Sequence, residues 1–204
     1  AVVNGLRVVA PVLPFPVVLH EFHGPEVEFD LIGLHFHGFR LDHGVPCYGW
    51  QIDLPRKPAF HPERAKALGV PMADWKRLQA GESVGSVTPA QVMGEPRPGI
   101  RLLYATDTRP TADIVRWGEG ADLMVLEGMY GDESKRPQAL KNHHMLFEEA
   151  AALARDAHAK RLLLTHFSNC IDDPEAYLPL ARAIFPNTDA AQDGQCVTLY
   201  YPER

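Results

Sequence analysis

IRLLYATDTR, the stretch at residues 100–109, contains an apolar run followed at once by polar, chemically capable residues. The run at residues 100–105 is typical of a strand that is buried within a sheet. Asp107 comes directly after it. A buried strand that ends in an Asp or a His presents that side chain at the rim of its sheet, where catalytic and metal-binding groups gather. The stretch therefore predicts a layered α/β fold with a functional group at the end of a strand.

Two further stretches repeat this arrangement: LDHG at residues 41–44 and LLLTHFS at residues 162–168. Together the three patterns place His43, Asp107 and His166 at strand ends. Because His and Asp are the only ligand types among them, they predict a divalent metal centre of the zinc or manganese kind. Each residue also has an ordinary interpretation: a hydrogen-bonded strand-end or core histidine for the two His, and a helix N-cap or an ion-paired carboxylate for Asp107.

Strands and helices alternate along the chain, which predicts one α/β layered domain over residues 1–204. We expect strands at residues 26–32, 34–41, 45–52, 100–105, 122–126, 161–165 and 197–201, and helices at residues 62–68, 73–79, 111–118, 145–157 and 174–185. Residues 53–98 lose this pattern and contain seven prolines. A stretch of this length with little structure inside a domain is usually a functional insertion.

The formal net charge of −6 argues against general affinity for nucleic acid. Residues 53–80 differ, because they hold six basic and three acidic residues, and such a local excess can contact phosphates or can be a solvated surface. No apolar run is long enough for a membrane helix, and no signal peptide is visible. Because the sequence opens without a Met, we expect its natural start to lie upstream. The three cysteines are expected to be reduced and mostly buried.

Three other groups of ionisable residues call for interpretation. His143 and His144 come just before the predicted helix at 145–157, where a neutral imidazole is favoured and can shuttle a proton. Glu127 follows the strand at 122–126 and either hydrogen-bonds a neighbouring His or caps a turn. His35 and His37 are expected to be surface or packing residues, because a straight strand would place His37 roughly 20 Å from His43.

The segments 42–50, 105–110, 126–128, 144–150 and 164–168 resemble, in their order and spacing, a ribonuclease Z-like member of the metallo-β-lactamase fold. The resemblance covers nearly the whole chain and corresponds to the C-terminal two-thirds of that family. It implies an incomplete αββα layered sandwich with an inserted arm at residues 53–98. It also implies a cytoplasmic, homodimeric hydrolase that uses two divalent metal ions, zinc or alternatively manganese.

The resemblance also implies roles for individual residues. His43 would bind the first metal, Asp107 would bridge the two metals, and His166 would bind the second. His144 would donate a proton, and Glu127 would be the acidic residue that accompanies it. The inserted arm would grip RNA through Arg56, Lys57, Arg64 and Lys66.

The chain also departs from the family pattern. The family's His-x-His-x-Asp-His motif lies upstream and is absent here, so this chain by itself would hold half of the site and would be inactive. Leu126 replaces the His before Glu127, Thr106 replaces the usual Gly before Asp107, and the arm lacks the Gly-Pro of arms that bind tRNA. These departures weaken the prediction of tRNA 3′ processing more than they weaken the prediction of a metal-dependent hydrolase.

Three functional hypotheses follow. The first is a metal-dependent phosphodiesterase, an endoribonuclease of ribonuclease Z type, with tRNA 3′ processing as its narrower form. The second is a hydrolase of small phosphodiesters or esters with the same fold. The third is a metal-free binding or assembly module, whose apolar face, exposed where the missing half would lie, would favour association.

Overall fold

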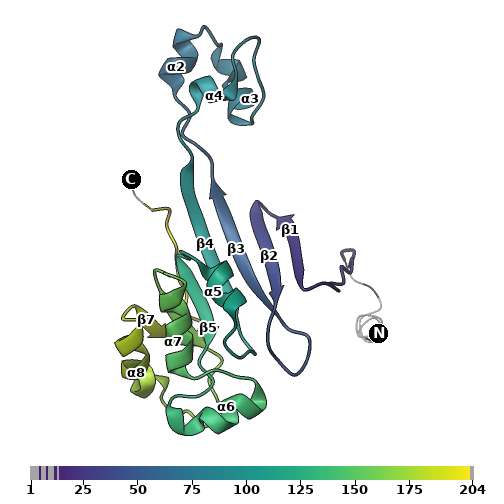
Figure 1. Ribbon diagram of the computed structural model, residues 1–204. Coiled ribbons are helices and arrows are strands. Elements are labelled where there is room, and N and C mark those ends of the chain that lie inside the picture. The colour runs from purple at the N-terminus through teal and green to yellow at the C-terminus, as the bar shows by residue number, and fades with distance from the viewer. Residues whose placement is uncertain (1–4, 6–7, 9–11, 13, 203–204) are drawn as a thin grey trace.

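A computed structural model describes residues 5, 8, 12 and 14–202 (Figure 1). The described residues form one seven-stranded sheet whose strands are ordered as they occur in the chain. The strands are β1 (Glu26–Leu31), β2 (Leu34–Arg40), β3 (Tyr48–Arg56), β4 (Arg97–Ala105), β5 (Leu123–Glu127), β6 (Leu162–Thr165) and β7 (Thr188–Ala190). The α/β fold predicted from the sequence is confirmed.

The pairing of neighbouring strands changes from antiparallel to parallel at β4. Strands β1 to β4 form an antiparallel meander, whereas β4 to β7 pair in parallel through helical crossovers. Strand β2 therefore runs in the same direction as β4, β5 and β6. The carboxyl ends of these four strands lie at one edge of the sheet, where the sequence places its candidate ligands.

Helices cover one face of the sheet. The helices are α2 (Pro62–Ala67), α3 (Trp75–Gln79), α4 (Pro89–Val92), α5 (Ala112–Gly118), α6 (Arg136–Asn142), α7 (Phe147–Asp156) and α8 (Leu178–Ile184), with short 3-10 turns at Met72–Asp74, Glu133–Lys135 and Pro174–Tyr177. Helices α5, α7 and α8 bury the side chains of alternate strand residues, among them Leu103, Met124, Leu126, Leu162 and Leu164. The apolar stripe predicted for residues 145–157 forms the buried face of α7.

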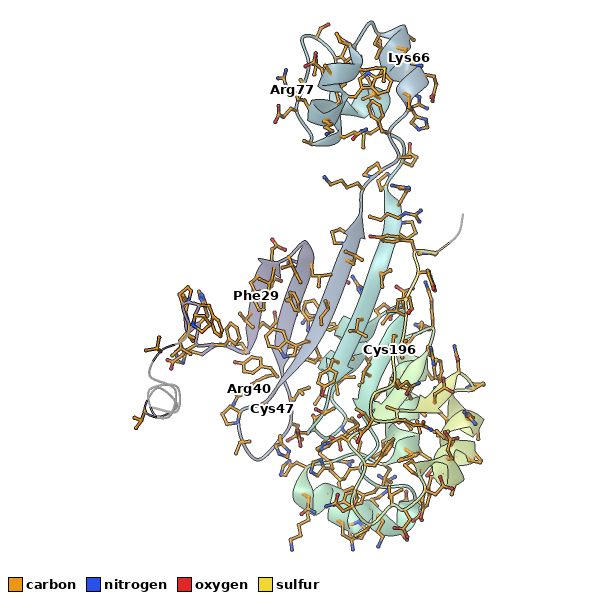
Figure 2. The ribbon with its side chains drawn as sticks, turned by 180° about the vertical axis from the view of Figure 1, so that it is seen from behind. Phe29, Arg40, Cys47, Lys66, Arg77 and Cys196 are labelled. Carbon is orange, nitrogen blue, oxygen red and sulfur yellow. The ribbon has the colours of Figure 1, made fainter. Side chains whose placement is uncertain are left out.

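The opposite face of the sheet is apolar but only partly covered. Phe29, Phe36, Trp50, Ile52 and Tyr104 line a shallow cavity of about 230 Å³ on it, and Phe29 is marked in Figure 2. Tyr104 is 41% exposed. The described residues thus supply one sheet and its helical layer, in agreement with the incomplete sandwich expected from the sequence.

An arm projects from the sheet where β3 and β4 extend beyond their neighbours (Figure 1). Its helices α2, α3 and α4 enclose a small core of their own, made of Ala65, Val70, Leu78, Val87 and Val92. Trp75 packs on Phe60 beside this core, and its indole N–H donates to the carbonyl of Val70. The arm lies at the far end of the sheet from α6.

The strands that carry the arm run further than the sequence indicates. Strand β3 continues to Arg56 and β4 begins at Arg97, so both strands extend into the predicted insertion at 53–98. The pairing of Asp53 with Arg101 in register, reinforced by two hydrogen bonds between their side chains at 2.8 and 3.1 Å, explains the extension.

The strand predicted at residues 197–201 is absent from the described part of the chain. Instead, Thr188–Ala190 pairs with β6 as β7, and the C-terminal tail leaves the sheet and runs toward the base of the arm (Figure 1). There, the Arg56 guanidinium lies 4.8 Å from the centre of the Tyr201 ring and donates to the carbonyl of Pro202 at 3.1 Å. These contacts replace the pairing that a strand would have made.

The expected burial of the cysteines is also wrong. All three cysteines are free, but Cys170 and Cys196 are exposed and only Cys47 is partly buried. Cys170 follows the site loop after β6, and Cys196 belongs to the C-terminal tail, so neither reaches the core.

His37 is a packing residue, in agreement with the sequence analysis. Its ring is 2% exposed, stacks on Trp117 with 3.5 Å between ring centres, and hydrogen-bonds Glu28 at 2.8 Å. His35 bonds Asp30 at the same sheet edge. Among the described residues, no helix combines the length and apolar character needed to cross a membrane.

Candidate metal centre

Adjacent parallel strands carry the candidate residues to one edge of the sheet. Register aligns Ala105 with Leu126 and Leu126 with Leu164, so the residues that follow the three positions emerge side by side. Asp107 and His166 lie just beyond β4 and β6, and Glu127 ends β5 between them.

Three side chains converge closely enough to share a cation. The donor atoms of Asp107, His144 and His166 all lie within 4.8 Å of one another. The Nε2 atom of His166 is 3.0 Å from an Asp107 carboxylate oxygen. The His144 and His166 rings are 5.6 Å apart between centres. His144, expected only as a proton donor, thus lies at ligand distance.

His43 lies next to this triad but outside it. Its ring centre is 5.4 Å from that of His144, and its Nδ1–H donates to the carbonyl of His143 at 3.3 Å. The other ring nitrogen remains available as an acceptor. His43 therefore borders the cluster rather than closing it.

The backbone is strained at the site. Asp107, His143 and His166 have left-handed φ angles of 58°, 58° and 57°. This conformation costs a residue other than glycine about 1 kcal/mol or more. Such strain clusters at functional sites, because the fold holds the residue where its side chain is needed.

Glu127 fixes the orientation of His144. One carboxylate oxygen of Glu127 accepts the Nδ1–H of His144 at 3.0 Å and the N–H of Met145 at 3.1 Å; the other accepts the N–H of Thr108 at 2.7 Å. The sequence left two interpretations of Glu127 open, and the structure shows the first, a hydrogen bond to a neighbouring histidine. The bond leaves Nε2 of His144 as the lone-pair nitrogen that faces Asp107 and His166.

Burial sets the ionisation of this pair. Glu127 is completely buried, and burial raises its pKa to about 8 against the opposing effect of the Thr108 and Met145 N–H groups. Burial, with the neighbouring His166 imidazole, lowers the pKa of His144. A neutral imidazole is the form that binds a metal.

The donor set fits a divalent metal. Two imidazole nitrogens and one carboxylate oxygen suit zinc or manganese better than calcium or magnesium, which take oxygen ligands. Asp107 and His166 would hold the ion directly, and His144 is close enough to do so.

The proposed substrate residues lie far from this cluster, on the arm and its base. Lys57, Arg64 and Lys66 are exposed, and Lys66 projects from the arm in Figure 2. Arg56 is instead engaged by the C-terminal tail.

Sequence reasoning missed the residues that brace the site. It assigned nothing to Thr108 and Glu149, and gave Arg109 only a possible pairing with Asp107. Helix α6 was missed as well, and His143 caps its carboxyl end. Thr111 caps α5, because its hydroxyl accepts the N–H of Ile114.

Comparison with known proteins decides the family. Residues 7–167 match the beta-lactamase superfamily domain. A ribonuclease Z from Clostridium kluyveri is 39% identical over 207 residues, which cover 99% of this chain and 68% of the relative. This chain belongs to the ribonuclease Z family.

Solved structures agree with the fold. The metallo-β-lactamase fold protein YhfI from Bacillus subtilis aligns with a TM-score of 0.56 at 19% identity, over 85% of this chain and 53% of YhfI. The short form of human tRNase Z aligns with a TM-score of 0.52, also at 19% identity, over 85% of this chain and 47% of the human protein. As a family member, the chain is expected to bind divalent metal.

Proposed function

We propose that this chain carries the metal-binding and proton-donating part of a phosphodiesterase of ribonuclease Z type, an endoribonuclease whose narrower activity is tRNA 3′ processing. The observation that carries the proposal is the convergence of Asp107, His144 and His166 at the ends of neighbouring strands. Membership of the ribonuclease Z family supports it.

In this proposal His43, Asp107 and His166 would be the metal ligands, and Asp107 would be the carboxylate shared by two ions. Zinc is the proposed metal, with manganese as the alternative. When bound, the ions would supply Lewis acidity toward the oxygens of the scissile phosphate. In its protonated form His144 would supply the proton for the leaving oxygen from Nε2, and Glu127 holds the ring with that nitrogen toward the site.

The remaining parts of the proposal concern organisation. Residues 1–204 form one domain with the arm as an insertion at 53–98, and the arm contacts substrate RNA through Arg56, Lys57, Arg64 and Lys66. We also propose a homodimer, supported by the apolar sheet face, and a cytoplasmic location, supported by the free cysteines of the described residues.

The metal site is tested by Asp107→Ala. We expect the variant to lose zinc affinity by about 100-fold or more in calorimetric titration, because outer-shell changes alone cost 10–100-fold. It should also abolish metal-dependent phosphodiesterase turnover in the protein produced from its natural gene. Asp156→Ala, at an exposed carboxylate paired with Arg155, is the matched control. Equal zinc affinity in parent and Asp107→Ala would refute the site, and a parent without affinity would favour the metal-free module.

The arm distinguishes RNA from a small substrate. Lys66→Gln removes an arm charge that forms no ion pair within the described part of the chain, whereas Arg155→Gln removes one on the body. If the arm contacts RNA, Lys66→Gln weakens RNA binding and lowers its salt dependence by about 0.7–0.9 in log–log slope. Arg155→Gln should leave the slope unchanged. The same slope in both variants would favour a small-molecule hydrolase.

A further inference from the structure

Arg109 connects the separate segments that carry the site. It lies two residues after Asp107, and its backbone N–H donates to the carbonyl of Asp42 at 3.0 Å. This bond forms an isolated bridge between the two residues. The N–H of Asp42 in turn donates to the Thr108 hydroxyl at 3.1 Å. The backbone directly before His43 is therefore hydrogen-bonded to the loop that carries Asp107.

The side chain of Arg109 reaches the third segment. Its guanidinium donates to the carbonyl of His144 at 2.5 Å and forms a two-pronged pair with the Glu149 carboxylate at 2.6 and 2.8 Å. Both partners of this ion pair are largely buried, with side chains only 14% and 13% exposed. Such planar, two-bond pairs fix orientation as well as adding energy.

Glu149 is itself held firmly at the start of α7. Its carboxylate accepts the N–H of Leu146 at 2.9 Å and a bond from Arg136 at 2.8 Å. Burial raises the pKa of Glu149, but the bonds from Arg109, Leu146 and Arg136 outweigh burial and lower it overall. The carboxylate thus anchors Arg109 to a rigid helix terminus.

His144 has two anchors as a result. Glu127 holds its ring through Nδ1, and Arg109 holds its backbone through the carbonyl. The side chain of Arg109 is directed to His144 and Glu149. Arg109 therefore supports the position of His144 and is not itself a metal ligand.

We propose that Arg109 is the positioning residue of this centre, which holds His144 at ligand distance from Asp107 and keeps the His43 loop beside them. This inference rests on the proposed function, because it assumes that the converging side chains bind metal. It assigns to Arg109 no contact with substrate or metal.

The test compares two arginines that share one partner. Arg109→Gln and Arg136→Gln each remove a guanidinium from Glu149, but only Arg109 also contacts His144. Zinc affinity is measured by calorimetry, and Co²⁺ is titrated with its visible absorption as a report on ligand geometry. Arg109→Lys, which keeps the charge but not the fork, serves as the conservative variant. Circular dichroism establishes that each variant is folded.

We expect Arg109→Gln to lose zinc affinity by about tenfold or more and to alter the Co²⁺ spectrum. Arg109→Lys should recover part of the affinity, and Arg136→Gln should stay within about twofold of the parent. If Arg109→Gln does not fold, the zinc affinity and Co²⁺ spectrum of Arg109→Lys, compared with those of the parent, test the positioning role instead.

A folded Arg109 variant with the zinc affinity and Co²⁺ spectrum of the parent would overturn the positioning role alone. Equal losses of zinc affinity in Arg109→Gln and Arg136→Gln would also overturn it, because they would mean that Arg109 only stabilises α7. A parent chain that binds neither ion would overturn the proposed function and this inference together.

Discussion

Histidines occupy most of the strained backbone positions in this protein. Among the described residues other than glycine, His143, His158 and His166 have positive φ, together with Asp107 and Ile32. His166 and Asp107 belong to the candidate metal centre, whereas His158 lies on the surface between α7 and β6. The strain at His166 and Asp107 therefore coincides with the candidate site, while that at His158 belongs to an ordinary turn.

The positive φ angles lead to a prediction for two glycine substitutions. Glycine adopts a left-handed conformation without steric cost, which favours both variants, but each variant also loses an exposed hydrogen bond, from His158 to Glu119 at 3.1 Å or from His143 to Asp42 at 3.0 Å. His158→Gly and His143→Gly should therefore each raise the free energy of unfolding by about 0.5 kcal/mol. Urea denaturation measures both. A loss of stability in His143→Gly would mean that the bond to Asp42 outweighs the backbone strain.

The sequence predicts some site residues well because their placement depends on strand ends. The short apolar runs before Asp107, Glu127 and His166 are typical of buried strands, and parallel neighbours bring their ends together. The bracing pair of Arg109 and Glu149 could not be found in this way. The two residues are 40 positions apart, and neither stands in a pattern that marks a partner.

At the scale of elements, the start of α7 depends on one carboxylate. Glu149 accepts bonds from Arg109, Arg136 and the N–H of Leu146, and together they lower its pKa. A carboxyl with a lowered pKa in the folded state stabilises the fold above its unfolded pKa, and this stabilisation is lost as the pH falls through the folded pKa.

Glu149→Gln should accordingly lower the free energy of unfolding at pH 7 by about 2 kcal/mol, since it removes one partner of a largely buried ion pair. The difference between parent and variant should shrink as the pH falls below about 4.5, where the unfolded carboxyl protonates. Urea denaturation between pH 3 and pH 7 measures this. Glu148→Gln, at the neighbouring position without an ion pair in the described residues, is the control. A difference that stays constant with pH would contradict the prediction.

Element boundaries were predicted unevenly, for physical reasons. Helix α7 has a continuous apolar stripe, so its position was predicted nearly to the residue. Helix α6 is short and buries only Ala139, so no stripe reveals it. Residues 197–201 alternate as a strand should but have no partner strand, whereas the three residues of β7 are too few to show a period.

At the scale of the whole molecule, the two faces of the sheet differ sharply. One is covered by α5, α7 and α8, while the other presents a group of aromatic residues that includes Phe29, which is labelled in Figure 2. An apolar surface of this kind favours association, in line with the proposed dimer.

Phe36→Thr should therefore weaken self-association, which sedimentation velocity over a range of concentrations measures. Threonine keeps the preference for a strand while removing the aromatic ring. His35→Thr, one residue earlier on the opposite face, is the matched control and should associate as the parent does. If Phe36→Thr associates as strongly as the parent, the dimer uses another surface.

The three tryptophans of the chain sit in three different environments: Trp50 on the open sheet face, Trp75 beside the arm core and Trp117 beneath His37. Variants that keep a single tryptophan would therefore report on different regions. Emission from Trp75 would follow the arm, quenching of Trp50 by iodide would follow the covering of the open face, and Trp117 would follow the packing of α5 on β2. The protein thus carries its own optical probes of the arm, the open face and the contact between helix and sheet.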